Sequence, residues 1–145
     1  MWLELSGWAI LPVAVVLLLG VAKFGWLWGL LATVLLANTL LLHEFAHLAA
    51  AVATRTPVLG VGFSIKGLYI RRKTARRRSA EIFIAAAGPL MNLLLAGLLW
   101  NGDRIMHWVA VVNAVLGISN LAPIGGTDGQ RIVSVLRKGV AAPAP

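Results

Sequence analysis

The sequence contains no cysteine and very few acidic residues. Without a thiol among its 145 residues, disulfide bonds, cysteine nucleophiles and cysteine-ligated metals are excluded. A metal would have to be bound by histidine or carboxylate side chains. Thirteen lysines and arginines outnumber the five carboxylates, which are Glu4, Glu44, Glu81, Asp103 and Asp128. A role that needs a carboxylate must therefore be assigned from this short list.

Polar sequence is also scarce. Hydrophobic residues make up 59% of the chain and the mean hydropathy is +0.86, which is too apolar for a soluble domain. A chain of 145 residues has room for only a few membrane-spanning helices. The composition predicts an integral membrane protein, with residues 1–145 forming a single membrane-embedded core and no separate soluble domain.

Four apolar stretches predict four membrane-spanning helices, at about residues 8–22, 24–54, 79–100 and 105–121. No lysine or arginine precedes the first stretch, so we expect a retained helix and not a signal peptide. Pro57 ends the second helix, because proline lacks a backbone N–H and disfavours helical geometry in the residue before it. A short amphipathic helix is expected at about residues 128–138. The predicted fold class is an all-α polytopic membrane protein.

The segment between the second and third apolar stretches has a different pattern. Leu59, Val61, Phe63 and Ile65 alternate with glycine, serine and lysine, which is the period of a β-strand. Gly67 suits the turn of a hairpin. We expect a small membrane-associated strand or hairpin near residues 58–70, since the segment is too short to span a bilayer as a helix.

Basic residues are distributed unevenly over the predicted loops. With four spans, eleven of the thirteen lysines and arginines lie on one side, and only Lys23 and Arg104 lie on the other. The positive-inside rule places the basic side, and both termini, in the cytosol, with the chain in the plasma membrane. Six basic residues between Arg71 and Arg78 are explained by this orientation and by contact with anionic lipid. Nucleic-acid binding is not expected, because no aromatic residues are interleaved with the basic run.

The second apolar stretch contains the polar cluster His43-Glu44-Phe45-Ala46-His47. On a helix, positions four residues apart share a face, so both imidazoles can reach one metal ion while Glu44 lies beside them to transfer protons. A shuffled chain of this composition would contain the pattern with a frequency of roughly one in a thousand. A purely structural polar cluster is the alternative, but each ionisable group near the bilayer centre costs about 2.5 to 3.5 kcal/mol. Metal binding is the favoured interpretation.

A catalytic metal needs a third protein ligand. Glu81 and Asp103 are expected near the membrane surfaces, salt-bridged or solvated, and His107 is expected to be an interfacial histidine. Asp128 follows Pro123 and two glycines, which break the helix and allow its carboxylate to turn towards a cavity. An Asp-Gly turn or a helix cap at the cytosolic surface explains Asp128 equally well. Spacing alone leaves both interpretations open.

Glycine, proline and asparagine residues in the third and fourth predicted helices have structural explanations. Gly88-Pro89 is typical of a kinked membrane helix, and Asn92 is typical of a hydrogen bond between helices. Asn113, Gly117 and Asn120 follow one face of the fourth predicted helix, which suits close helix packing. We expect no chemistry from these three.

Three motifs together resemble the site-2 protease family of intramembrane zinc metalloproteases. They are H-E-x-x-H at residues 43–47, Gly88-Pro89-Leu90-Met91-Asn92, and N-x-x-P-x-x-x-x-D-G at residues 120–129, in the order of the family. The resemblance covers about residues 24–138. It implies that His43, His47 and Asp128 bind Zn²⁺, that Glu44 is the general base, and that Asn92 contacts the substrate or the oxyanion.

The same resemblance makes the segment at residues 59–70 similar to the membrane-associated β segment of the family, whose edge holds substrate. Pairing with that edge would satisfy the backbone of an unwound substrate, and proline at Val61 or Phe63 is then expected to lower turnover. The chain has no recognisable PDZ or CBS domain, so we expect a minimal core that is either constitutive or regulated by a membrane partner.

The sequence therefore predicts an intramembrane zinc endopeptidase that cleaves a transmembrane protein substrate, with Glu44 and Asn92 as catalytic residues. The alternative is a non-catalytic zinc-binding membrane protein, either a transporter or a pseudoprotease adaptor. A membrane tether that uses the basic loop is a third class. Neither the substrate nor the oligomeric state can be read from the sequence.

Overall fold

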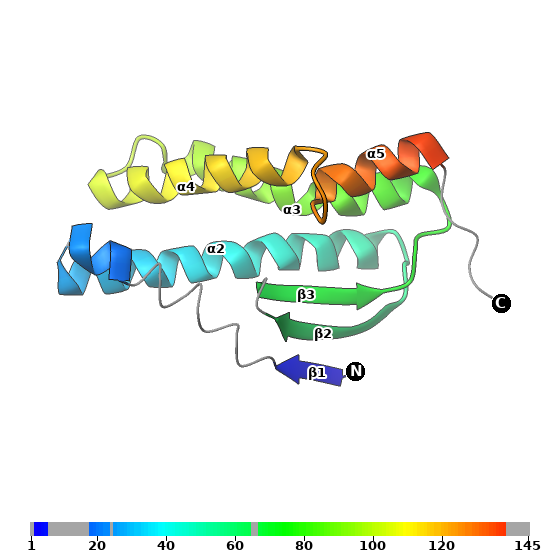
Figure 1. The fold of residues 1–145 in the computed structure, drawn as a ribbon, viewed down its shortest axis with the longest axis horizontal. Coiled ribbons are helices and arrows are strands. Elements are labelled where there is room, and N and C mark those ends of the chain that lie inside the picture. The colour runs from blue at the N-terminus through cyan, green and yellow to red at the C-terminus, as the bar shows by residue number, and fades with distance from the viewer. Residues whose placement is uncertain (1, 6–17, 24, 65–66, 139–145) are drawn as a thin grey trace.

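The computed structural model describes residues 2–5, 18–23, 25–64 and 67–138 (Figure 1). Its helices are α2 (Trp26–Ala53), α3 (Arg78–Leu99), α4 (Arg104–Leu121) and α5 (Asp128–Lys138). Its strands are β1 (Trp2–Leu5), β2 (Val58–Ser64) and β3 (Gly67–Arg72). Helix α3 packs against α2, α4 and α5, and the small sheet lies along α2 on the side away from α4. The predicted fold class, helical with a small sheet, is confirmed.

Three described helices, α2, α3 and α4, are long and apolar enough to cross a membrane. Their bounds lie within two residues of the predicted ranges. Of the first predicted span, residues 18–22 are helical, and the part at residues 8–17 lies outside the described residues. Large apolar side chains are exposed along all three helices, for example Leu27, Phe45, Leu98 and Ile118. Exposing so much apolar surface to water would be unfavourable, so these helices identify an integral membrane protein.

Helix α2 has 28 residues and is about 42 Å long, more than the hydrocarbon thickness of a bilayer. It ends in a Schellman-type turn, in which Thr56 N–H donates to Ala51 O at 2.8 Å and Arg55 N–H donates to Val52 O at 2.9 Å. Arg55 takes the left-handed position of this turn with φ 53°, a conformation that usually selects glycine. The turn, followed by Pro57, directs the chain back into β2.

The sheet has the order β1-β2-β3, with β2 parallel to β1 and antiparallel to β3. The predicted hairpin is therefore present, and it extends to Arg72. Strand β1 was not predicted, because its four residues carry too short a pattern. Since β2 is paired on both sides, proline at Val61 or Phe63 would disturb pairing within the sheet itself, and its expected effect on turnover stays a prediction. In the described part of the chain, the unpaired edge nearest α2 belongs to β3.

Small and amide side chains bring the helices close together. A Cβ atom at Gly117 would lie 2.8 Å from Leu93 Cγ and 3.0 Å from Pro89 O, so α3 and α4 are in contact through this glycine. Asn113 is buried on α4 and donates a 3.1 Å hydrogen bond to Thr39 Oγ1 of α2. The predicted packing role of these two residues is confirmed. Asn120 differs, since it lies at the wall of a polar cavity described below.

Candidate metal centre

Three side chains from two distant segments meet between α2 and α5. His43 and His47 lie one turn apart on α2, and their Nε2 atoms are 3.1 Å apart. Asp128, the first residue of α5, places Oδ2 at 3.5 Å from His43 Nε2 and 3.3 Å from His47 Nε2. The structure therefore brings together the two histidines and the aspartate that the motifs suggested, and their donor atoms all lie within 4.8 Å of one another.

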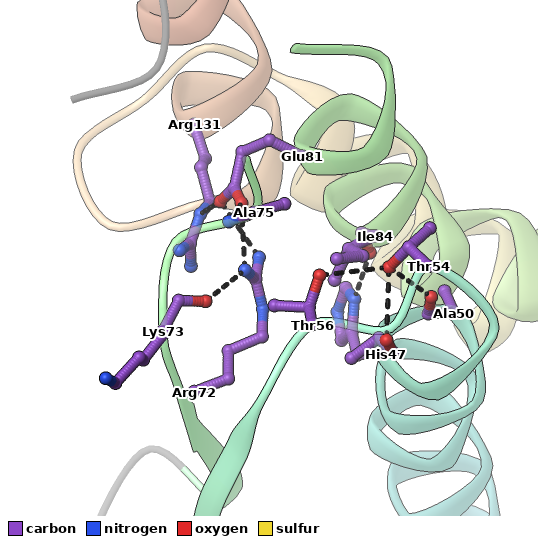
Figure 2. A network of polar contacts seen from close by, with 11 residues as sticks. His47, Ala50, Thr54, Thr56, Arg72, Lys73, Ala75, Glu81, Ile84 and Arg131 are labelled. Carbon is purple, nitrogen blue, oxygen red and sulfur yellow. Dashed lines mark hydrogen bonds and ion pairs between the residues drawn. The ribbon is translucent and has the colours of Figure 1, made fainter. Parts of the chain in front are cut away.

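The far side of each imidazole is held by a hydrogen bond. His47 Nδ1 donates to the backbone oxygen of Ile84 at 2.6 Å (Figure 2), and His43 Nδ1 donates to Asn92 Oδ1 at 2.6 Å. A carbonyl oxygen only accepts, so the proton of His47 must be on Nδ1. Both Nε2 lone pairs are then directed at the shared space beside Asp128, which is the arrangement that metal-binding histidines need.

The spacing of the three donor atoms fits a four-coordinate ion. An ion with tetrahedral bonds of about 2.0 to 2.1 Å holds its donors about 3.3 Å apart. The three observed separations are 3.1, 3.3 and 3.5 Å. Three protein donors also leave the fourth position for water or substrate. The residues present therefore fit a catalytic type of metal site.

Gly88 of α3 allows the two imidazoles to sit where they do. A Cβ atom at this position would be 2.6 Å from His43 Nε2 and would overlap His47 Nε2. The sequence interpretation, a glycine that only kinks the helix, is incomplete, because the missing side chain provides room for the histidine pair. This requirement cannot be read from the Gly-Pro dipeptide itself.

Asp128 is directed towards the histidines by a tight connection between α4 and α5. Gly126 has φ 89°, and Thr127 Oγ1 donates to Ala122 O at 2.6 Å. A Cβ atom at Gly129 would overlap the backbone oxygen of Leu121, so the chain passes very close to the end of α4. The Asp128 side chain is only 21% exposed, and an Asp-Gly turn or cap at the surface does not describe it.

The environment of Asp128 favours the charged carboxylate. Burial raises the pKa of Asp128, but without a metal the imidazoles can carry a second proton on Nε2, and hydrogen bonds and positive charge from His43 and His47 in that form outweigh burial and lower the pKa to about 2. A carboxylate that is ionised at neutral pH is ready to bind a cation without first losing a proton.

The candidate ligands open onto a cavity of about 300 Å³. Glu44 lies on its wall, and so do Ile70 and Arg72 of β3 and Asn120, Gly126 and Arg131 from the α4–α5 region. Glu44 also lines a neighbouring apolar cavity of about 270 Å³ between α2 and the hairpin. Glu44 therefore borders both the cavity of the candidate ligands and the apolar cavity beside the hairpin.

Asn92 lies behind His43 and not at the cavity wall. Its side chain is 1% exposed, Oδ1 accepts from His43, and Nδ2 has no hydrogen-bond partner in the described chain. Contact of Asn92 with substrate or oxyanion stays a prediction. What its geometry supplies is the orientation of one histidine.

The other predicted polar residues lie away from the centre or support it from outside. Asp103 caps α4 by accepting from Ile105 N–H and Met106 N–H at 2.9 Å, and His107 is exposed and donates from Nδ1 to Trp100 O at 2.8 Å. Glu81 is salt-bridged, as expected, but it is fully buried and pairs with Arg72 at 2.9 Å. The explanation of the basic run by orientation and lipid contact therefore fails for Arg72, which points inwards.

Sequence reasoning missed three polar residues of the cavity wall: Arg72, Asn120 and Arg131. Asn120 had a signal, since it is the first residue of the third motif. Arg72 and Arg131 had none, because they lie among other basic residues near the membrane surface.

Comparisons with known proteins point to one family, although no protein-family model matches the chain. The chain is 33% identical over 124 residues to "Putative zinc metalloprotease Rip3" of Mycobacterium tuberculosis, in each of two strains. The alignment covers 74% of this chain and 31% of the relative, so the chain spans about a third of the length of these curated relatives. Among solved structures, a site-2 protease from Methanocaldococcus jannaschii has the same fold, with a TM-score of 0.69 and 24% identity over 93% of this chain and 66% of that one. The chain is therefore similar in sequence to a putative zinc metalloprotease and shares its fold with a site-2 protease, the family that its three motifs resemble.

Proposed function

We propose that this chain is an intramembrane zinc endopeptidase that cleaves a transmembrane protein substrate. The observation that carries the proposal is the convergence of His43, His47 and Asp128 on one point, with Glu44 on the wall of the same cavity. The helix that bears the histidines has an apolar outer surface, so the centre would work at membrane depth. The printed names of the relatives, a zinc metalloprotease and a site-2 protease, support the same activity.

His43, His47 and Asp128 would hold the zinc ion, which supplies a water of lowered pKa and polarises the scissile carbonyl. Glu44 accepts the proton of the attacking water and returns it to the leaving amine. Asn92 and the backbone oxygen of Ile84 keep the two imidazoles in the tautomer that binds metal. Each protein group thus has one task.

The metal ligands are tested by metal analysis of the purified protein beside its Asp128→Ala variant. We expect stoichiometric zinc in the parent protein and a zinc affinity at least about 100-fold lower in the variant, because one of three protein donors is lost and even outer-shell changes lower affinity 10- to 100-fold. Full zinc retention in Asp128→Ala would show that another residue is the third ligand.

Substrate presentation is proposed to occur at the outer edge of β3. A transmembrane helix hides its carbonyl groups in its own hydrogen bonds, so it must unwind before attack, and lipid cannot satisfy the released groups. Strand β3 is an unpaired edge in the described chain, and its residues Ile70 and Arg72 line the cavity of the histidines. A substrate strand added there would lie beside the metal ligands.

Ile70 is the position for testing strand addition. The hairpin closes at Ser64 and Gly67 with a two-residue connection, and alternation along an antiparallel ladder then directs the N–H of Ile70 outwards. Ile70→Pro should keep pairing with β2 but remove the outward donor. We expect cleavage about 3- to 10-fold slower than in Ile70→Ala, the control that removes the side chain only, with equal zinc content. Equal cleavage rates in the two variants would contradict strand addition.

Anionic phospholipid is the proposed ligand of a separate basic cavity of about 800 Å³. Its wall carries Arg55, Arg76 and Arg77 with neighbouring threonine and serine hydroxyls, at the end of the molecule where α2 ends and α3 begins. In the described chain no carboxylate pairs with these three arginines. Their charge supports a cytosolic location for this end of the molecule. Loss of co-purified anionic lipid from a variant with glutamine at all three positions is the measurement that checks it.

A further inference from the structure

A single buried carboxylate holds together the segments that surround the candidate metal centre. Glu81, in the first turn of α3, is 1% exposed. It accepts from Arg72 Nη1 and Nη2 at 2.9 Å each, from the backbone N–H of Ala75 at 2.8 Å and from Arg131 Nε at 2.6 Å (Figure 2). Four hydrogen bonds to one carboxylate, three of them from guanidinium groups, form a strong and directional contact.

The partners of Glu81 belong to different parts of the fold. Arg72 is the last residue of β3, the proposed substrate strand, and its side chain is only 6% exposed. Arg131 is on α5, three residues after Asp128, so both side chains lie on the same face of that helix. Both arginines line the cavity that His43 and His47 also line. Glu81 therefore connects α3 with the edge strand and with the helix that carries the third candidate ligand.

The placement of Asp128 depends on how α5 is docked. The tight loop before it ties Asp128 to the end of α4 through Thr127 Oγ1 and Ala122 O, but residues 123–126 of this loop are exposed and do not pack against the rest of the bundle. On the other side, α5 is held to the bundle by buried Gly129 and Val135 and by the ion pair of Arg131 with Glu81. Metal–ligand distances tolerate changes of only about 0.2 Å, so a small movement of α5 would take Asp128 out of bonding distance.

We propose that Glu81 is a positioning residue of the metal centre. Through Arg131 it fixes Asp128 opposite the histidine pair, and through Arg72 it fixes β3 beside the same cavity. Glu81 touches neither metal nor substrate, and it acts only through these two arginines. The inference depends on the proposed function only in requiring that the centre binds zinc, and it does not require cleavage.

The test uses Arg131→Gln, with Arg137→Gln as the matched control. Both arginines are exposed and both variants remove one positive charge from α5, but only Arg131 contacts Glu81 in the described chain. Zinc affinity is measured by chelator competition in detergent, and ligand geometry is measured from the visible spectrum of the cobalt-substituted protein. We expect Arg131→Gln to bind zinc about 10- to 100-fold more weakly with an altered cobalt spectrum, and Arg137→Gln to match the parent protein.

A conservative replacement and a double variant sharpen the result. Arg131→Lys should recover only part of the affinity, because a lysine ammonium does not reproduce the planar geometry of the guanidinium. Arg131→Gln should lower zinc affinity by a smaller factor in the Glu81→Gln variant than in the parent protein, because the two residues act through one contact. Equal effects in both backgrounds would mean that Arg131 acts independently of Glu81, against the proposal.

A metal-free measurement is also available, because the chain has no cysteine of its own. Spin labels attached to Ser134→Cys on α5 and Leu40→Cys on α2, both exposed positions, report the distance between these helices. We expect a narrow distance distribution in the parent background, a broader one with Arg131→Gln and no change with Arg137→Gln.

Two outcomes separate this inference from the proposed function. If Arg131→Gln keeps the parent zinc affinity, cobalt spectrum and label distances while only its thermal stability falls, Glu81 is a fold-stabilising residue and the inference is wrong. If the parent protein binds zinc but cleaves no membrane substrate, the proposed function is wrong, while the affinity comparison still decides the role of Glu81.

Discussion

Replacing Glu44 by glutamine is expected to slow peptide cleavage by about 10²- to 10⁴-fold while zinc remains stoichiometric, the range typical of a lost general base. The amide has nearly the same shape as the carboxylate but cannot accept the proton of the attacking water. Glu44 lies on the cavity wall and is not one of the three clustered donor atoms, so the metal should stay bound. Cleavage of a membrane-embedded substrate and metal content, measured on the same preparation, check both parts.

Glu44→Asp is the control for this prediction, because it keeps a carboxylate one methylene group further away. It should retain more activity than Glu44→Gln. Unchanged cleavage in Glu44→Gln would remove Glu44 as the base. Zinc without any cleavage, in the parent protein as well, would favour the non-catalytic alternative, a transporter or an adaptor.

Gly88→Ala is expected to lower zinc affinity by about 100-fold or more, although the substitution adds only one methyl group and replaces none of the three candidate ligands. The new Cβ would lie 2.6 Å from His43 Nε2 and would overlap His47 Nε2. Either the imidazoles must rotate or α2 and α3 must separate, and both movements break the donor spacing that a tetrahedral ion requires. Chelator competition with the purified variant measures the loss.

Gly97→Ala provides a matched control on the same helix. A Cβ atom at Gly97 would meet nothing within 4 Å, and alanine is the better helix former by about 1 kcal/mol. This variant should bind zinc as the parent protein does and be at least as stable. Parent-like zinc binding by Gly88→Ala would mean that the histidine pair can be accommodated without this glycine, against the close packing of α3 on the imidazoles.

Local patterns explain what could be predicted from the sequence. His43 and His47 share a helix face because the α-helix has 3.6 residues per turn, and this holds whatever the helix packs against. The alternation around Val61 and Phe63 predicted a strand for the same reason, since side chains in a strand change face at every residue. The ranges of the spanning helices followed from hydrophobic length alone.

Predictions about partners were less successful, because a partner is set by packing between segments. For Asn92 the sequence favoured a hydrogen bond between helices without a partner, and the structure places its Oδ1 on His43, 49 residues away in sequence, while contact with substrate or oxyanion stays a prediction. Arg72 was grouped with lipid-facing arginines because its neighbours in sequence are basic, and the structure places it on buried Glu81. The pairing of β1 with β2 changed which strand keeps a free edge.

The sequence by itself determined that two histidines and a glutamate occupy adjacent positions on an apolar helix, because helical periodicity and hydrophobic length are properties of a continuous stretch of chain. Only the tertiary structure decided which of the five carboxylates joins the histidines, what holds that carboxylate in place, and which strand edge is open beside it. These features depend on distances between segments that are 50 or more residues apart in sequence. A glycine contact, a tight loop and a buried ion pair set these distances, and none of the three leaves a periodic pattern in the sequence.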